Sequence, residues 1–252
     1  MVYLRSFLFN VFGFTTIIVA ALVVIVTFWA PYRFHWWICV NWCRLALRGA
    51  KFFCGIRIEV EGKENLPDRP SVIMIKHTST LETLWQVTAF PQTTWVLKRE
   101  ITWMPIFGWV IGLALKPIAI NRSSGGSAVR QVIRQGRKKI EDGIWVTVFP
   151  EGTRMPPGET RRYGVSGAAL AAEAACPVVP VAHNAGDLWS RRAFVKRAGT
   201  VRFVIGPSVD PTTQPPKETN LIVQRWVEST MYEISRIYRE KVPPQPADYE
   251  RG

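Results

Sequence analysis

The sequence predicts an α/β fold: a mixed, mostly parallel sheet flanked by helices, with an N-terminal helical membrane anchor. Short apolar or alternating segments recur along the chain, amphipathic or small-residue helical patterns lie between several of them, and a long uncharged apolar run opens the chain. Strands that alternate with helices are typical of a sheet with helices packed on it. The chain has 252 residues, of which 48% are hydrophobic, so it can bury a core of ordinary size.

The first segment is long and apolar enough to cross a bilayer. No charged residue lies between Ser6 and Tyr32, and the centre reads "FTTIIVAALVVIVTFWA", whereas about 20 apolar residues suffice for a span. The following "TFWAPYRFHWW" offers no signal-peptidase site, so we expect the segment to stay. More basic residues follow it than precede it, namely Arg33, Arg44, Arg48 and Lys51 against Arg5. This asymmetry favours a cytoplasmic position for the rest of the chain.

A second apolar segment, "FHWWICVNWCRLAL" at 34–47, is shorter, more polar and rich in tryptophan. We expect it to lie at the membrane interface. Two arrangements fit the pattern: a helical hairpin that dips into one leaflet, or a spanning helix followed by a surface helix. The predicted organisation is an anchor at 1–52, a catalytic domain at 53–242 and a Pro-rich tail at 243–252.

The remaining elements follow from hydrophobic periodicity. Alternating or continuous apolar runs predict strands at 56–60, 71–75, 93–97, 116–120, 143–149, 177–183 and 200–206. Helical spacing of apolar or small residues predicts helices at 127–140, 166–176 and 218–241. In such sheets, ligands bind just beyond the carboxyl ends of the strands. We therefore expect the chemistry in the loops that follow 71–75, 93–97 and 143–149.

Composition narrows the function. The net charge is +13, so the expected partners are anionic, and the many aromatic residues beside apolar segments favour membrane lipid over nucleic acid. RNA-reading and helix-turn-helix signatures are absent from the sequence. The four cysteines have no paired spacing, and three histidines far apart in sequence do not indicate a zinc site. We expect no metal.

His77 is the first catalytic candidate. It follows the apolar run "SVIMI" directly, and Glu82 lies five residues further on, in the expected first turn of a helix. A carboxylate there could accept the Nδ1 proton of the imidazole and leave Nε2 to take a proton from a hydroxyl group. The alternative, with about equal weight, is that "STLE" is a capping box in which Glu82 serves only the helix start.

The segment "FPEGTR" at 149–154 is the second candidate. Pro150 and Gly152 shape a tight turn after a strand, and Arg154 can bind phosphate in bidentate fashion. Alternatively, Glu151 and Arg154 form a salt bridge across the turn. A third cationic point is Lys98 with its neighbour at 99, ahead of the apolar "ITWMPIFGWVIGLAL"; a cation beside apolar surface suits a phosphorylated lipid.

Four blocks in this order, "KHTSTLE", "KREITWMPIFGW", "FPEGTR" and "VVPVAHNAG", resemble the glycerolipid acyltransferases. The likeness is closest to the bacterial 1-acyl-sn-glycerol-3-phosphate (lysophosphatidic acid) acyltransferases, and it covers roughly residues 55–210. It implies a glycerol-3-phosphate acyltransferase-like fold and a location in the bacterial inner membrane with the catalytic domain on the cytoplasmic side. The sequence departs from the family pattern at one position, where the first block ends in Glu82 instead of aspartate.

The resemblance also implies residue roles. His77 would act as general base, oriented by Glu82, and Pro180 in the fourth block would lie near the acyl donor. The acceptor would be bound by residues of the second and third blocks: Lys98, Glu151, Gly152, Thr153 and Arg154, with Lys98 and Arg154 on its phosphate.

The implied reaction transfers an acyl group to the sn-2 hydroxyl of lysophosphatidic acid and gives phosphatidic acid for phospholipid biosynthesis. The donor is acyl-CoA or acyl carrier protein, which is then a partner, and no cofactor is needed because a thioester is already activated. Two alternatives stay open: an acyltransferase for another lyso-lipid, such as a lyso-ornithine lipid or a lysophospholipid, and a non-catalytic, membrane-anchored basic binding protein.

Overall fold

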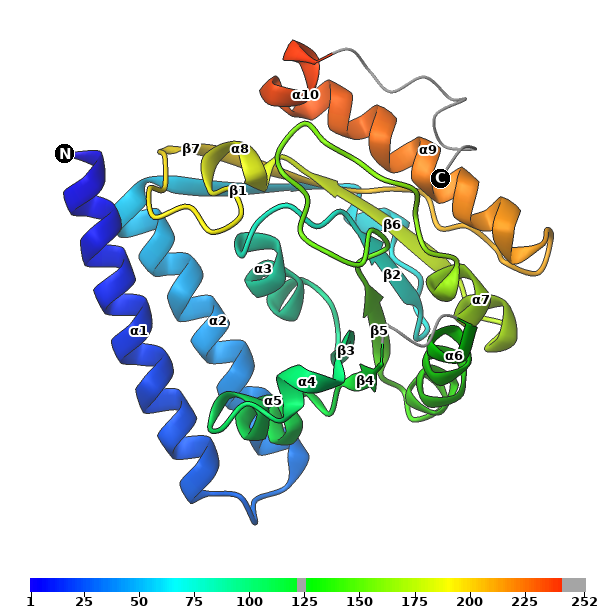
Figure 1. Ribbon diagram of the computed structural model, residues 1–252, viewed down its shortest axis with the longest axis horizontal. Helices are drawn as coiled ribbons and strands as arrows, with labels where there is room; N and C mark the ends of the chain where they lie inside the picture. The colour runs from blue at the N-terminus through cyan, green and yellow to red at the C-terminus, as the bar shows by residue number, and fades with distance from the viewer. Residues whose placement is uncertain (122–125, 242–252) are drawn as a thin grey trace.

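The chain opens with two long helices that run side by side. The computed structural model describes residues 1–121 and 126–241, and in it α1 (Val2–Val26) and α2 (Tyr32–Cys54) form a hairpin (Figure 1). His35 fastens the turn between them, because its Nε2 lies 2.8 Å from the carbonyl oxygen of Thr27. The helical segment thus extends two residues beyond the range 1–52 predicted for the anchor. The predicted tail at 243–252 lies outside the described residues.

A seven-stranded sheet forms the centre of the molecule. Its strand order is β1-β7-β6-β2-β5-β3-β4, and all pairs are parallel except β6 with β7. The strands are β1 (Ile56–Glu61), β2 (Val72–Ile75), β3 (Thr93–Lys98), β4 (Ile118–Ile120), β5 (Trp145–Val148), β6 (Val178–His183) and β7 (Gly199–Ile205). Each predicted strand is present, and the predicted mixed, mostly parallel sheet is confirmed.

Helices cover both faces of the sheet, which explains why its central strands are apolar on both sides. In β2, Val72 and Met74 join the core beneath one set of helices, whereas Ile73 and Ile75 join the core on the other face. The first set is α6 (Gly126–Glu141), α7 (Ser166–Glu173) and α9 (Pro216–Ile234); the second includes α3 (Leu81–Ala89) and the carboxyl end of α2. The remaining helices are η1 (Lys63–Asn65), α4 (Arg99–Thr102), α5 (Phe107–Leu115), α8 (Ala185–Leu188) and α10 (Arg236–Glu240).

The helix predicted over 218–241 is interrupted. It divides into α9 and α10 at Ser235, whose backbone is extended with φ −97° and ψ 125°. The Ser235 hydroxyl donates to Asp187 at 2.7 Å and accepts the amide proton of Tyr238. The break therefore depends on a partner 48 residues away in sequence, which helical periodicity along one segment cannot reveal.

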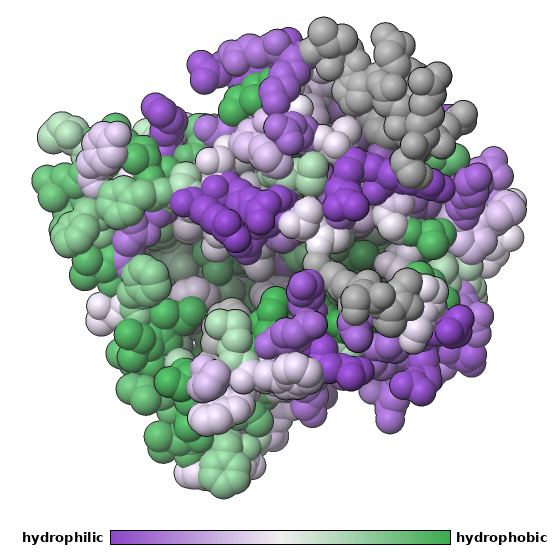
Figure 2. All heavy atoms as spheres, viewed as in Figure 1, coloured by the Kyte–Doolittle hydropathy of each residue, from purple (hydrophilic) through white to green (hydrophobic). Residues whose placement is uncertain are grey.

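The helix α1 presents an apolar surface to the outside. Among the described residues it is the helix whose length and composition would allow it to cross a membrane, and 17% of its most apolar window is buried. Figure 2 shows hydrophobic residues gathered over the part of the molecule that holds α1. Large exposed side chains on α1 include Phe7, Val11, Phe14, Ile18 and Leu22. This surface is consistent with the predicted membrane anchor, since a contiguous exposed apolar patch marks a membrane or protein contact.

Gly62, which follows β1, packs closely against the end of β7, so a substitution there tests this contact. It has φ +73°, and a Cβ atom there would overlap the carbonyl oxygen of Ile205. We expect Gly62→Ala to lower the free energy of unfolding by more than about 2 kcal/mol, because backbone strain and overlap add. Gly143→Ala is the control, since Gly143 has φ +80° with open space around it and should cost about 1–2 kcal/mol. Thermal unfolding in detergent measures both, and equal losses would contradict the predicted overlap.

Candidate active site

The polar blocks meet because four neighbouring parallel strands end at one edge of the sheet. The strands β6, β2, β5 and β3 are adjacent in that order. His77 follows β2, the segment 149–154 follows β5, and His183 and Lys98 end β6 and β3. Segments far apart in sequence thereby form one site, as expected for the carboxyl edge of a parallel sheet.

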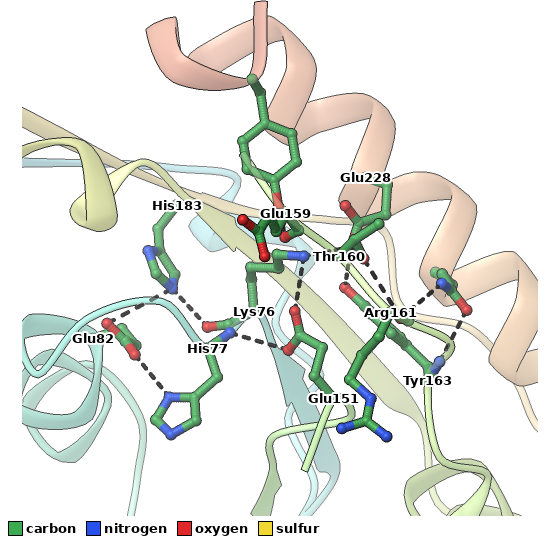
Figure 3. Close-up of polar contacts among 12 residues, drawn as sticks. Lys76, His77, Glu82, Glu151, Glu159, Thr160, Arg161, Tyr163, His183 and Glu228 are labelled. Carbon is green, nitrogen blue, oxygen red and sulfur yellow. Dashed lines mark hydrogen bonds and ion pairs between the residues drawn. The ribbon is translucent and has the colours of Figure 1, made fainter. Parts of the chain in front are cut away.

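The histidine and the glutamate of the first block are in contact, as predicted. The Nδ1 atom of His77 lies 2.8 Å from Oε1 of Glu82. The same oxygen accepts the backbone amide proton of Ser79 at 3.0 Å, and the hydroxyl of Ser79 accepts the amide proton of Leu81. Figure 3 shows the contact of Glu82 with His77. The same carboxylate oxygen reaches back to the Ser79 amide, as in a capping box, so the predicted His–acid pair and the predicted capping contact of Glu82 are both present.

Glu82 is fully buried, so its charge needs nearby compensation. Burial by itself would raise the pKa of Glu82, but the hydrogen bond with His77 and the proximity of His183 lower the pKa below its ordinary value. The carboxylate is thus ionised at neutral pH. An ionised carboxylate accepts the Nδ1 proton of His77, which places the lone pair of the neutral ring on Nε2.

His183 supports this arrangement from β6. Its Nε2 donates to the carbonyl oxygen of Lys76 at 2.7 Å, and its Nδ1 accepts the amide proton of Ala185. Its Nε2 also lies 4.0 Å from Oε2 of Glu82. Burial lowers the pKa of His183, so the ring is neutral and its tautomer is fixed by these two hydrogen bonds. His183 therefore holds the backbone that carries His77.

The FPEGTR segment packs directly on His77. The ring of Phe149 stacks on the imidazole with centroids 3.8 Å apart and an interplanar angle of 24°. Beyond the segment, the amide of Met155 donates to the carbonyl oxygen of His77 at 2.7 Å. Gly152 adopts φ +70°, which lets the turn reverse, and its amide donates to the carbonyl of Phe149. The imidazole is therefore fixed by Phe149 on its face and by Glu82 at its edge.

Glu151 is buried and pairs with a lysine. The Nζ atom of Lys76 lies 2.7 Å from Oε1 of Glu151 and 2.8 Å from Oε1 of Glu228 on α9, and all three side chains are nearly inaccessible. The other oxygen of Glu151 accepts the backbone amide proton of His77 at 3.2 Å. Among the described residues the ionic partner of Glu151 is Lys76, so the alternative pairing of Glu151 with Arg154 is wrong.

The cluster of Lys76, Glu151 and Glu228 joins one basic and two acidic side chains. Burial by itself would lower the pKa of Lys76, but the two carboxylates raise it, so the amine stays protonated. Burial raises the pKa of Glu151 to about 7, with Glu228 adding to the rise and Lys76 opposing it. Glu228 also accepts the hydroxyl protons of Thr160 and Tyr163, both at 2.8 Å. The cluster ties α9 to the loops that carry the site (Figure 3).

The cationic candidates Arg154 and Lys98 lie on different segments of the site. Arg154 contacts α3 through Nη2, which lies 3.4 Å from the hydroxyl of Thr83. Its Nε is buried and has no hydrogen-bond partner among the described residues.

Lys98 is exposed at the end of β3. In the sheet order β3 is two strands from β2, which places the two strands about 10 Å apart at the usual strand spacing. Thr153 is half-buried in the turn. Contact of these residues, and of Glu151 and Gly152, with an acceptor stays a prediction.

Sequence reasoning missed three contributors to the site: Lys76, His183 and Glu228. The position of His183 could have revealed it, because His183 ends an apolar strand just as His77 follows one. The position of Lys76 could have revealed it too, since a lysine between an apolar run and a catalytic candidate needs a buried counter-charge. Glu228 had none, because it lies on an amphipathic helix among other charged residues.

Comparison with known proteins identifies the family of this chain. The acyltransferase family model matches residues 57–184. A 1-acyl-sn-glycerol-3-phosphate acyltransferase of Pseudomonas aeruginosa is 43% identical over 226 residues, which are 88% of this chain and 86% of that protein. The 1-acyl-sn-glycerol-3-phosphate acyltransferase alpha of Mus musculus is 30% identical over 205 residues, covering 78% of this chain and 69% of that protein. The chain therefore belongs to the acyltransferase family, and the predicted resemblance is confirmed.

A solved structure shares the fold. The crystal structure of the 1-acyl-sn-glycerophosphate acyltransferase PlsC from Thermotoga maritima matches with a TM-score of 0.74 at 22% identity. The match covers 92% of this chain and 97% of that one, so it includes most of the N-terminal hairpin as well as the sheet.

The buried lysine gives a test of the cluster. We expect Lys76→Met to lower the free energy of unfolding by about 3–5 kcal/mol at pH 8, because it strands two buried carboxylates. Lys76 lowers the pKa of Glu151, so without the lysine that pKa lies above the wild-type value of about 7. Below about pH 7 Glu151 is protonated in the folded state of both proteins, whereas at higher pH the wild type can ionise it beside Lys76 and the variant cannot. The deficit of Lys76→Met should therefore be smallest at pH 5 and grow as the pH rises through about 7. Denaturant unfolding between pH 5 and 8 measures this trend.

Arg202→Met is the matched control for that experiment. Arg202 forms an exposed pair with Glu61, with Nε and Oε1 2.7 Å apart. Its loss should cost less than about 1 kcal/mol. If Lys76→Met costs no more than Arg202→Met, or if its deficit is the same at both ends of the pH range, the buried cluster does not act as described.

Proposed function

We propose that the protein transfers a fatty acyl group from acyl-CoA or acyl carrier protein to the sn-2 hydroxyl of 1-acyl-sn-glycerol 3-phosphate and so makes phosphatidic acid. The observation that carries the proposal is the contact of His77 with Glu82 at the carboxyl edge of the sheet, at 2.8 Å. The identity of 43% with a bacterial relative named for this reaction supports the choice of acceptor.

The chemistry follows from the tautomer of His77. With Nδ1–H held by Glu82, Nε2 removes the proton of the sn-2 hydroxyl as its oxygen attacks the thioester carbon. The tetrahedral intermediate then collapses, the C–S bond breaks, and the imidazolium returns the proton to the thiolate. The ester, the free thiol and neutral His77 are the products. A thioester needs no metal or redox group for this step, so we propose none.

The oxyanion of the tetrahedral intermediate needs hydrogen-bond donors, and three backbone amides of the site already donate to other groups. The backbone amides of His77, Ser79 and Gly152 donate to Glu151, Glu82 and the Phe149 carbonyl, respectively. Other donors of the two loops at 77–80 and 152–154 must therefore stabilise the developing charge. His77 belongs to the first loop, and Met155, which follows the second loop, donates its amide proton to the His77 carbonyl, so both loops adjoin the catalytic histidine.

Arg154 and Lys98 supply the phosphate-binding charge in this proposal. Arg154 is half-buried and forms no ion pair with a carboxylate among the described residues, which supports the role, because a guanidinium can bind phosphate through two parallel hydrogen bonds. The acceptor and the product are lipids, which accords with the apolar surface of α1. We assign the protein to the bacterial inner membrane with the catalytic domain on the cytoplasmic side, from the basic residues that follow α1.

Acyl transfer from labelled oleoyl-CoA to lysophosphatidic acid tests the proposal. Purified wild-type protein should make phosphatidic acid, and His77→Ala should lower turnover by at least about 10²-fold, the usual size of a general-base contribution. His35→Ala is the control, since His35 lies in the first turn of α2, where its ring contacts the Thr27 carbonyl, and its loss should leave turnover near the wild-type value. Transfer to other lyso-lipids only would favour another acceptor, and equal activity of wild type and His77→Ala would contradict the proposal.

A further inference from the structure

A basic groove lies between the start of α4 and the amino-terminal half of α6. It has a volume of about 490 Å³ and is lined by Arg99, Ser127, Arg130, Gln131, Arg134 and Gln135. Three of these six residues are arginines, and none is acidic. The volume falls in the range of small-molecule sites, and the lining has the composition of a site for a multiply charged anion.

The three arginines of the groove have no ionic partner in the part of the chain that the structure describes. Among the described residues, no carboxylate lies within ion-pair distance of Arg99, Arg130 or Arg134. Arg137 on the same helix behaves differently, because it pairs with Glu141 at 2.8 Å and with Glu173 at 3.3 Å. Arg130 and Arg134 are four residues apart, so their like charges repel along the helix. The arrangement weakens α6 and favours binding of an anion.

Neutral donors complete the groove. The Nε2 atom of Gln131 donates to the hydroxyl of Ser127 at 3.3 Å, which leaves the Ser127 proton available for a ligand. Ser127 also stands in the first turn of α6, a helix of 16 residues whose amino terminus carries partial positive charge. Hydroxyl, helix terminus and guanidinium groups therefore face the same groove.

The position of the groove separates it from the membrane anchor. Figure 1 shows α6 at the opposite side of the molecule from α1 and α2, and Figure 2 shows hydrophilic residues gathered there. The groove nevertheless lies at the reactive edge of the sheet, since Arg99 directly follows Lys98 at the end of β3. A ligand that arrives from water can therefore occupy the groove and extend toward His77.

We propose that this groove binds the phosphate groups of coenzyme A when acyl-CoA is the donor; the inference rests on the proposed acyl transfer. Coenzyme A carries a diphosphate and a 3′-phosphate, whereas the lysophosphatidic acid acceptor carries one phosphate, for which Arg154 and Lys98 suffice. The pantetheine arm joins the phosphates to the thioester, so the charged end can be held at a distance from the reacting carbon. The groove thus discriminates donors by their phosphates.

The test compares the double variant Arg130→Gln/Arg134→Gln with Arg137→Gln. Glutamine keeps helix propensity, and Arg137 offers a matched loss of charge on the same helix. Binding of free coenzyme A is measured by calorimetry on detergent-solubilised full-length protein, and KM is measured for oleoyl-CoA and for lysophosphatidic acid. We expect the double variant to raise the Kd of coenzyme A and the KM of oleoyl-CoA at least about tenfold. The KM of lysophosphatidic acid, and all constants of Arg137→Gln, should change by less than about twofold.

Further measurements separate the other sources of anionic charge. Removal of the 3′-phosphate, in 3′-dephospho-coenzyme A, should weaken binding to wild type and have less effect on the double variant. Equal effects of Arg137→Gln and the double variant would show that coenzyme A responds to the overall positive charge of α6 and not to the groove, and would overturn the proposal. Loss confined to acyl carrier protein donors, or to binding of phosphatidylglycerol vesicles, would also overturn it, as would wild-type protein that does not bind coenzyme A. If wild type binds coenzyme A through these arginines but makes no phosphatidic acid, the groove stands and the proposed function fails.

Discussion

The buried carboxylate of Glu82 is the constraint on which the rest of the site depends. One of its oxygens accepts hydrogen bonds from both the His77 ring and the Ser79 amide, so the start of α3 and the orientation of the imidazole are set together. Because the carboxylate is fully buried, these two hydrogen bonds and the nearby His183 offset the burial that would otherwise raise its pKa. Glutamate performs this role here where aspartate is usual in the family, and its extra methylene reaches the capping position as well as the histidine.

A buried cluster of charged side chains, Lys76, Glu151 and Glu228, adjoins the His77–Glu82 pair at the same edge of the sheet. Lys76 precedes His77 in sequence, and its ammonium group bridges Glu151 of the FPEGTR turn and Glu228 of α9. Glu151 in turn binds the amide of His77. The backbone of the histidine is thus held from inside the protein while its ring is held at the surface. Such a site is preorganised, which limits the reorganisation needed as charge develops on the substrate.

The strands and the His–acid contact could be predicted because their signals are local. Apolar runs define the strands, and the five-residue spacing of His77 and Glu82 fits a strand end followed by a helix start. The ion pair of Lys76 with Glu228 joins residues 152 positions apart, and the stacking of Phe149 on His77 depends on the order of β2 and β5 in the sheet. Periodicity carries no information on such pairings. The rule that ligands bind at the carboxyl ends of parallel strands indicated which loops hold the site, and the family resemblance indicated which residues of those loops act together.

The tautomer of His77 is the most direct test of the account. The chain has three histidines, so the ring nitrogens can be assigned by ¹⁵N NMR of histidine-labelled protein and of single-histidine variants. At about pH 8, where an ordinary imidazole is neutral, we expect His77 to carry its proton on Nδ1 and its lone pair on Nε2. Glu82→Gln should abolish that preference. A proton on Nε2 in the wild type would contradict the role of His77 as a base held by Glu82.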